Sequence, residues 1–171
     1  MGAALAALGV AYPEARLLGV EPDVENLRIA RVNLERFGDR GQLVGAAIWD
    51  RNDQLAVERN EVGSHGITIG VAAPTGGGEV TVPGLTIDQL LERHVPRDED
   101  IDYMHVTIEG SEPRVFAAGG LWPRRVRSLR VEVHPYYGYT TEECCRQLGE
   151  LGYRAWPCPT PPGKWVFAIR R

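Results

Sequence analysis

Apolar runs of strand length alternate with helix-forming segments over most of the chain, and this order restricts the fold more than any other feature. Apolar runs lie at residues 15–20 and 42–49, further strands with one apolar face are predicted at 101–108 and 127–133, and a last helix of the series ends at Gly152. Continuous apolar runs suit strands that are buried on both faces. Because strands and helices alternate, we predict a doubly wound α/β fold with a mostly parallel sheet.

Two stretches depart from this alternation. Residues 153–156 and 165–169 flank a Pro-rich turn, which predicts an antiparallel hairpin at the C-terminal end of the sheet. Residues 51–84 contain glycines between short β-branched pieces, which indicates a β-rich insertion. The glycines at 76–78 do not lead into a helix, so a turn is favoured over a phosphate cradle. We expect one domain over residues 1–171.

Three helix starts are marked by capping residues. Asp23 precedes an amphipathic segment as a predicted N-cap. Thr86 with Gln89, and Thr140 with Glu143, have the spacing of a capping box, in which each side chain bonds to the backbone of the other residue.

The composition excludes several classes of protein. The 171 residues carry a net charge of −4 and 43% of them are apolar, which suits a folded domain and argues against a nucleic-acid partner. No apolar run approaches the roughly 20 residues that span a bilayer, so we expect no membrane partner. Cys144, Cys145 and Cys158 form no C-x-x-C pair, which favours reduced thiols and a cytoplasmic protein.

Polar side chains lie along one face of two predicted strands. Glu109 and His134 come at the ends of these strands, where open α/β sheets build their ligand crevice, so we expect them to line a pocket. Ser128 and Arg130 lie nearer a strand start, and for them a sheet face open to water is the favoured interpretation.

Glu21 ends the first predicted strand and has two interpretations. A carboxylate there can accept the hydroxyl protons of a nucleoside ribose, because it offers two acceptor oxygens. An acidic side chain before the helix that starts near Asp23 is also good capping chemistry. The two remain open at this point.

Five segments carry motifs in a fixed order: Glu21-Pro22-Asp23 with Asn26 and Asn33, then residues 45–50 (GAAIWD), 85–91 (LTIDQLL), 105–112 (HVTIEGSE) and 131–134 (VEVH). Their order and spacing over residues 15–155 resemble the FkbM family of S-adenosylmethionine-dependent methyltransferases. The resemblance implies a Rossmann-like class I methyltransferase fold, S-adenosylmethionine as cofactor, and O-methylation of a small-molecule or sugar hydroxyl. It also implies that Glu21 holds the cofactor ribose and that the stretch from Ala46 to Trp49, which includes Ala47 and Ile48, lies near its adenine.

The motif at 105–112 departs from the family pattern K-x-D-x-E-G-x-E, because His105 replaces the Lys and Thr107 replaces the Asp. His105 can still act as a base, since imidazole titrates near neutral pH. The predicted site residues fall into two sets. The acceptor proton is assigned to His105, Glu109 or His134, and contacts with the acceptor to Thr107, Glu112 and Glu132.

The sequence starts too late to contain the strand and Gly-rich loop with which such methyltransferases begin. We expect an N-terminally truncated sheet that lacks a central strand, with a missing upstream segment favoured over a partner that covers the gap or a decayed copy. An uncovered sheet edge would favour homo-oligomers.

Three other functions compete with methyl transfer. The main alternative is a non-catalytic methyltransferase-like binding or scaffold module that has lost the cofactor loop. A nicotinamide-dependent enzyme would also use Glu21, but no G-x-G-x-x-G is present. A metal site on the polar strand ends is disfavoured because no known ligand spacing occurs.

Overall fold

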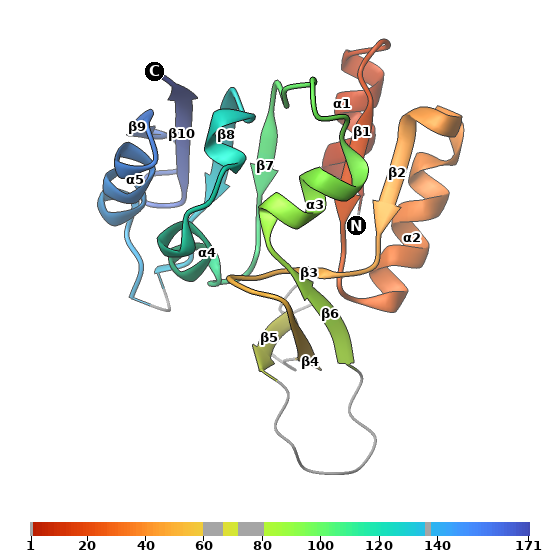
Figure 1. The fold of residues 1–171 in the computed structure, drawn as a ribbon, viewed down its shortest axis with the longest axis horizontal. Coiled ribbons are helices and arrows are strands. Elements are labelled where there is room, and N and C mark those ends of the chain that lie inside the picture. The colour runs from red at the N-terminus through yellow and green to blue at the C-terminus, as the bar shows by residue number, and fades with distance from the viewer. Residues whose placement is uncertain (1, 60–66, 72–80, 136–137) are drawn as a thin grey trace. The chain divides into compact units, whose positions relative to one another are not determined.

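The computed structural model describes residues 2–59, 67–71, 81–135 and 138–171, and these fall into two compact units (Figure 1). Unit 1 comprises Met1–Ala47 and Asn52–Gly84, and unit 2 comprises Ile48–Arg51 and Leu85–Arg171. The expectation of one domain over residues 1–171 stays a prediction.

Unit 1 contains a small α/β layer in which β1 and β2 pair in parallel, with Leu17 opposite Gly41. Leu17 and Phe37 belong to its buried core. Helix α1 lies close to this core, because a Cβ atom on Gly9 would come within 2.6 Å of the Leu17 side chain and 2.7 Å of Phe37. The elements of this layer are α1 (Ala3–Ala11), β1 (Leu17–Val20), α2 (Val24–Leu34), the 3₁₀ segment η1 (Glu35–Arg40) and β2 (Gly41–Val44).

Asp23 starts α2 as predicted, since its Oδ1 accepts a hydrogen bond from the backbone N–H of Asn26 at 2.8 Å. After η1 begins, Gly38 takes a φ of +54°, which a side chain would disfavour, and the chain then turns into β2.

The insertion is β-rich, as expected. Its strands are β4 (Asp53–Arg59), β5 (Ile67–Val71) and β6 (Thr81–Leu85), and with β3 (Ala47–Ile48) they form a sheet in the order β3-β6-β4-β5. Strand β4 pairs antiparallel with both β5 and β6. The predicted turn at residues 76–78 lies outside the described residues.

Unit 2 is built on a four-stranded sheet in the order β7-β8-β10-β9. β7 and β8 are parallel, whereas β10 runs antiparallel to both of its neighbours, so the predicted C-terminal hairpin is present. The elements of unit 2 are α3 (Ile87–His94), β7 (Met104–Val106), α4 (Glu112–Ala118), the 3₁₀ turn η2 (Trp122–Arg124), β8 (Ser128–Glu132), α5 (Thr141–Glu150), β9 (Tyr153–Pro157) and β10 (Trp165–Arg170).

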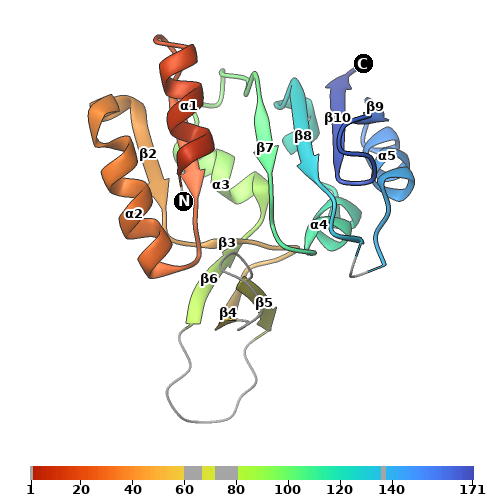
Figure 2. The ribbon, with the colours of Figure 1, turned by 180° about the vertical axis from the view of Figure 1, so that it is seen from behind.

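The two faces of this sheet differ. On one face α5 packs against β9 and β10 with α4 beside it, over buried residues such as Leu129, Val131 and Val166. No described helix of unit 2 covers the other face, and Figure 2 shows β7, β8 and β10 from that side. Ser128 and Arg130 lie on this open face but are half-buried, and the Arg130 guanidinium lies 3.9 Å from the Trp165 ring centroid.

The sheets are mixed, which corrects the expectation of one mostly parallel sheet. Parallel pairing occurs between β1 and β2 and between β7 and β8, but these two pairs belong to separate sheets. The hairpin places β10 beside β8, where a parallel sheet would continue, and the insertion adds further antiparallel pairs. Among the described residues, β1 pairs only with β2 and β7 only with β8.

No helix in the described part of the chain has the length and apolar character needed to span a membrane.

Candidate active site

A histidine lies between two glutamates where β7 and β8 end. The Nδ1 atom of His134 is 3.0 Å from Oε1 of Glu112, and its Nε2 atom is 3.4 Å from Oε2 of Glu109. His134 follows β8, and both glutamates follow β7. Because the two strands are parallel, their carboxyl ends meet at one edge of the sheet, which is where the sequence predicted Glu109 and His134.

Glu112 is the buried partner of this histidine. Its side chain is fully buried, and Oε1 accepts a second hydrogen bond from the backbone N–H of Ile108 at 3.1 Å. Its other oxygen, Oε2, has no hydrogen-bond partner among the described residues. A buried carboxylate in this position fixes the histidine ring, since Nδ1–H donates to Oε1.

Glu109 is the accessible partner and has an unusual backbone. Its φ is +50°, and no other non-glycine residue in the described ranges has a positive φ. Such a conformation costs free energy and persists only where the surrounding structure enforces it. Gly110 follows with a φ of +92°. The turn brings the Glu109 carboxylate to His134 while 38% of its side chain stays exposed.

The electrostatics of the cluster favour a protonated imidazole. The hydrogen bond to Glu112 raises the pKa of His134, against an opposing effect of burial, and the charges of Glu112, Glu109 and Glu132 raise it further. Because Nδ1 faces Glu112, Nε2 is the atom that gains and loses a proton beside Glu109.

His105 lies apart from this cluster, on the open face of the sheet. Its ring centroid is 5.5 Å from that of Trp165, edge to face. Burial lowers the pKa of His105, and the charge of Arg130 lowers it further. Glu132 makes a 3.0 Å ion pair with Lys164, and Thr107 is exposed. The structure therefore brings together Glu109, Glu112 and His134 from the predicted set, with Glu132 acting on His134 by its charge.

Trp49 and Asp50 form a second polar group in unit 2, of which Trp49 belongs to the stretch predicted near the adenine and Asp50 was not assigned from the sequence. The Arg114 guanidinium lies 4.8 Å from the Trp49 ring centroid, and its Nε is 3.8 Å from Oδ2 of Asp50. Among the described residues, Trp49 Nε1 and Asp50 Oδ1 are buried without a hydrogen bond, although Oδ1 lies 3.5 Å from the Arg51 guanidinium. Asp50 directly follows the strand predicted at residues 42–49, and this position was the sequence signal that could have identified it as a site residue.

Glu21 lies at the end of β1 in unit 1. Its Oε1 accepts a hydrogen bond from the backbone N–H of Asp23 at 3.0 Å, and burial raises the pKa of the carboxyl. Asp23 itself is the N-cap of α2, so the helix start does not depend on Glu21 alone. A carboxylate accepts about four hydrogen bonds, so the bond from Asp23 does not use the full acceptor capacity of Glu21. Of the two predicted adenine neighbours, Ala47 is buried and Ile48 is half-buried.

In the described ranges, no group of three or more His, Cys, Asp or Glu residues is arranged to hold a metal ion.

Comparison with known proteins gives one match. The family model described as "Methyltransferase FkbM domain" matches residues 6–155. No curated protein and no solved structure matches the chain.

Proposed function

The chain belongs to the FkbM methyltransferase family, whose model covers residues 6–155, and we propose that it methylates a hydroxyl group of a small molecule or sugar with S-adenosylmethionine as donor. The observation that carries this proposal is the His134 ring between buried Glu112 and accessible Glu109. A base that is oriented by a buried carboxylate and reachable on its other nitrogen suits proton removal from a hydroxyl.

S-adenosylmethionine would supply a methyl group on a positively charged sulfur. In this proposal Glu21 would bind the ribose hydroxyls of the cofactor. Ile48 and the buried Ala47 would lie next to its adenine. The unsatisfied buried atoms of Trp49 and Asp50 add polar groups that a bound ligand can satisfy.

His134 acts as the general base in this proposal. Its neutral Nε2 would accept the proton of the acceptor hydroxyl as that oxygen becomes methylated. Glu112 accepts the Nδ1–H throughout and holds the ring. Glu109 then accepts a hydrogen bond from the new Nε2–H, which stabilises the imidazolium.

The remaining predicted residues have supporting roles. Thr107 and Glu132 are assigned to the acceptor. His105 is the second candidate base, because its lowered pKa keeps it neutral at physiological pH.

The test begins with a calorimetric titration of the whole chain with S-adenosylmethionine. We expect micromolar binding, which Glu21→Gln weakens by about tenfold because the amide oxygen is a poorer acceptor than a carboxylate. Glu14→Gln is the matched control, since Glu14 is exposed and outside the candidate site. Absence of binding by the unaltered chain would contradict cofactor binding by these residues as they stand, and absence of binding also by a version extended by an upstream strand and Gly-rich loop would favour the non-catalytic module.

The second step is a methyl-transfer assay with a labelled donor and a panel of sugar and small-molecule hydroxyls. His134→Gln should abolish transfer and leave cofactor binding unchanged. If His105→Gln abolishes transfer and His134→Gln does not, the base is His105.

A further inference from the structure

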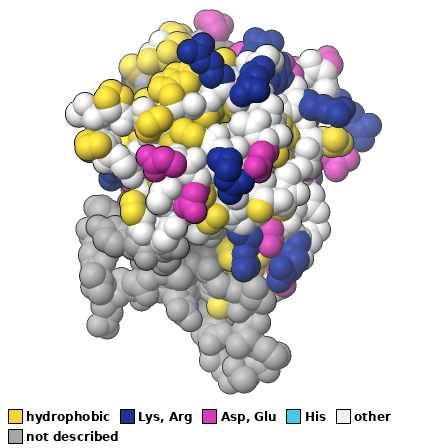
Figure 3. Space-filling view, turned by 90° about the vertical axis from the view of Figure 1, so that its left-hand side faces the viewer, with side chains coloured by type: hydrophobic (Ala, Val, Ile, Leu, Met, Phe, Trp, Pro, Cys, Tyr) yellow, Lys and Arg dark blue, Asp and Glu magenta, His cyan; other side chains and the backbone are white. Residues whose placement is uncertain are grey.

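The open face of the unit 2 sheet is rich in apolar and cationic side chains. Trp156 and Ile169 are 39% and 53% exposed there, although large apolar side chains are normally covered. The pairing registers put them on one face, with Arg154 opposite Ile169 and Trp156 opposite Phe167. Figure 3 shows hydrophobic side chains gathered next to Lys and Arg side chains on the side of the molecule where α5 and β9 lie.

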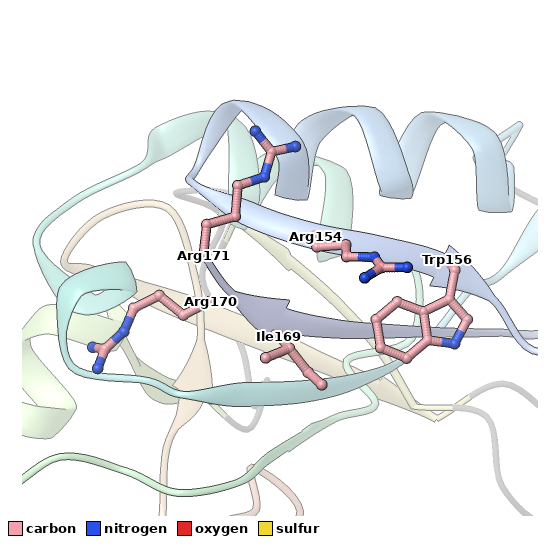
Figure 4. Close-up of a pocket in the computed structure, with 5 residues that line it drawn as sticks. All are labelled: Arg154, Trp156, Ile169, Arg170 and Arg171. Carbon is pink, nitrogen blue, oxygen red and sulfur yellow. The ribbon is translucent and has the colours of Figure 1, made fainter.

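An open hollow in the surface, with a volume of about 550 Å³ and called the cavity below, lies at β9 and β10 along the edge of this sheet. Figure 4 shows the side chains that line it, which are Arg154, Trp156, Ile169, Arg170 and Arg171. This volume is within the range of about 300–1,000 Å³ that small-molecule sites occupy. We propose that the cavity binds a small organic anion that carries a flat apolar ring.

The lining has the two kinds of group that such an anion requires. Trp156 and Ile169 offer an aromatic and an aliphatic surface to a ring. Arg154 and Arg171 are exposed guanidiniums, for which no ion pair is found within the described residues, and they suit a carboxylate, sulfonate or phosphate.

Arg170 differs from Arg154 and Arg171 because it forms an ion pair. Its guanidinium pairs with Asp100 at 3.0 Å and donates to the backbone carbonyl of Arg124, so it is turned away from Trp156 and Arg154, as Figure 4 shows. No acidic side chain lines the cavity, and the charge of Asp100 is balanced by Arg170 and Arg127. The lining therefore favours an anion over a cation or a neutral ligand.

This cavity is separate from the candidate active site. Ile169 pairs with Ser128, at the start of β8, whereas His134 follows the end of that strand. Strands rise about 3.3 Å per residue, so the two places are roughly 20 Å apart along the sheet. A ligand in the cavity is thus not the group that receives a methyl group at His134, and the inference does not depend on the proposed function.

The test is a calorimetric titration of the whole chain with 1-naphthalenesulfonate, which combines a flat ring with one negative charge. We expect a single site with a dissociation constant on the order of 0.1 mM. Sulfate offers the charge alone and 1-naphthalenemethanol the ring alone, and each should bind at least about tenfold more weakly.

Variants locate the binding. Arg154→Gln and Trp156→Leu should each weaken it by at least about fivefold, and Arg154→Lys should retain most of it. The matched controls are Arg93→Gln, an exposed arginine on α3, and Tyr103→Leu, an exposed ring on the open face outside the cavity, and both should bind as the unaltered chain does. Melting temperatures check that each variant is folded. If Trp156→Leu does not fold, the comparison of Arg154→Gln with Arg154→Lys still tests the proposal.

Three results would overturn the proposal. One is the absence of saturable binding by the unaltered chain. The second is binding that Arg154→Gln leaves unchanged. The third is binding of sulfate or of 1-naphthalenemethanol as tight as that of 1-naphthalenesulfonate.

Discussion

Helices α4 and α5 pack side by side in unit 2 but begin in different ways. At the start of α5, Thr140 accepts a hydrogen bond from the backbone N–H of Glu143 at 3.2 Å, and the Glu143 carboxylate accepts one from the backbone N–H of Thr140 at 2.9 Å. At the start of α4, the Ser111 side chain makes no capping hydrogen bond. The Glu112 carboxylate points to His134 and Ile108 instead.

The difference separates polar groups that stabilise a helix from polar groups that hold a site. A carboxylate in a capping box is solvated and satisfies the helix backbone. Glu112 is fully buried, and one of its oxygens has no partner in the described part of the chain. Departures from local rules gather at functional sites, and the positive φ of Glu109 lies three residues from Glu112.

The largest effect should come from Glu112→Ala. This change removes the acceptor of two hydrogen bonds and leaves His134 Nδ1 and the Ile108 amide without a partner. Breaking a buried charged pair costs about 3 kcal/mol or more, so the free energy of unfolding should fall by that amount in a urea titration. A loss no larger than that caused by removing a helix cap would show that Glu112 is not central to the packing.

Glu112→Gln tests the charge of the same residue. The hydrogen bond to Glu112 is the largest cause of the raised pKa of His134, so this variant should lower that pKa toward its ordinary value in an NMR titration. Under the proposed function, methyl transfer requires neutral His134. The rate of the unaltered protein should therefore rise with pH above about 6.5, and this rise should move to lower pH in the variant.

Stability provides a second measure of the same shift. A histidine whose pKa is raised on folding stabilises the protein fully below its unfolded pKa of about 6.5, and this contribution is lost as pH rises through the folded pKa. In Glu112→Gln, the free energy of unfolding should therefore decrease less as pH rises through this range. An unchanged pH profile of both rate and stability would contradict the role given to Glu112.

The sequence predicted the capping of helices better than it predicted the side-chain contacts of the candidate active site. Both capping boxes and the Asp23 cap were predicted and are confirmed, because each depends on residues three positions apart. Glu112 and His134 are 22 residues apart in the chain, and their contact depends on the parallel pairing of β7 with β8. The sequence placed Glu109 and His134 at the ends of two predicted strands. It gave no indication that Glu112 would be buried against His134.

The division of the strands among separate sheets was missed for a similar reason. The hairpin of β9 and β10 was predicted, but its placement beside β8 was not, because strand order follows from long-range packing. That placement puts Arg154, Trp156 and Ile169 on a face that no described helix of unit 2 covers. Local patterns predict elements and their caps, and the sites arise where elements distant in sequence meet.

The smallest effects come from the two N-cap side chains, and they sharpen the comparison most directly. Thr140→Ala removes a hydrogen bond that the structure contains, so unfolding should become easier by about 1 kcal/mol. Ser111→Ala removes a side chain that makes no capping bond, so its effect should stay within about 0.5 kcal/mol although Ser111 is buried. Urea titrations of both variants decide the matter, with Thr140→Ser as the control that keeps the hydroxyl. Equal decreases in the free energy of unfolding at the two positions would mean that Ser111 does cap α4. The contact of Glu112 with His134 would then not replace a capping interaction at the start of that helix.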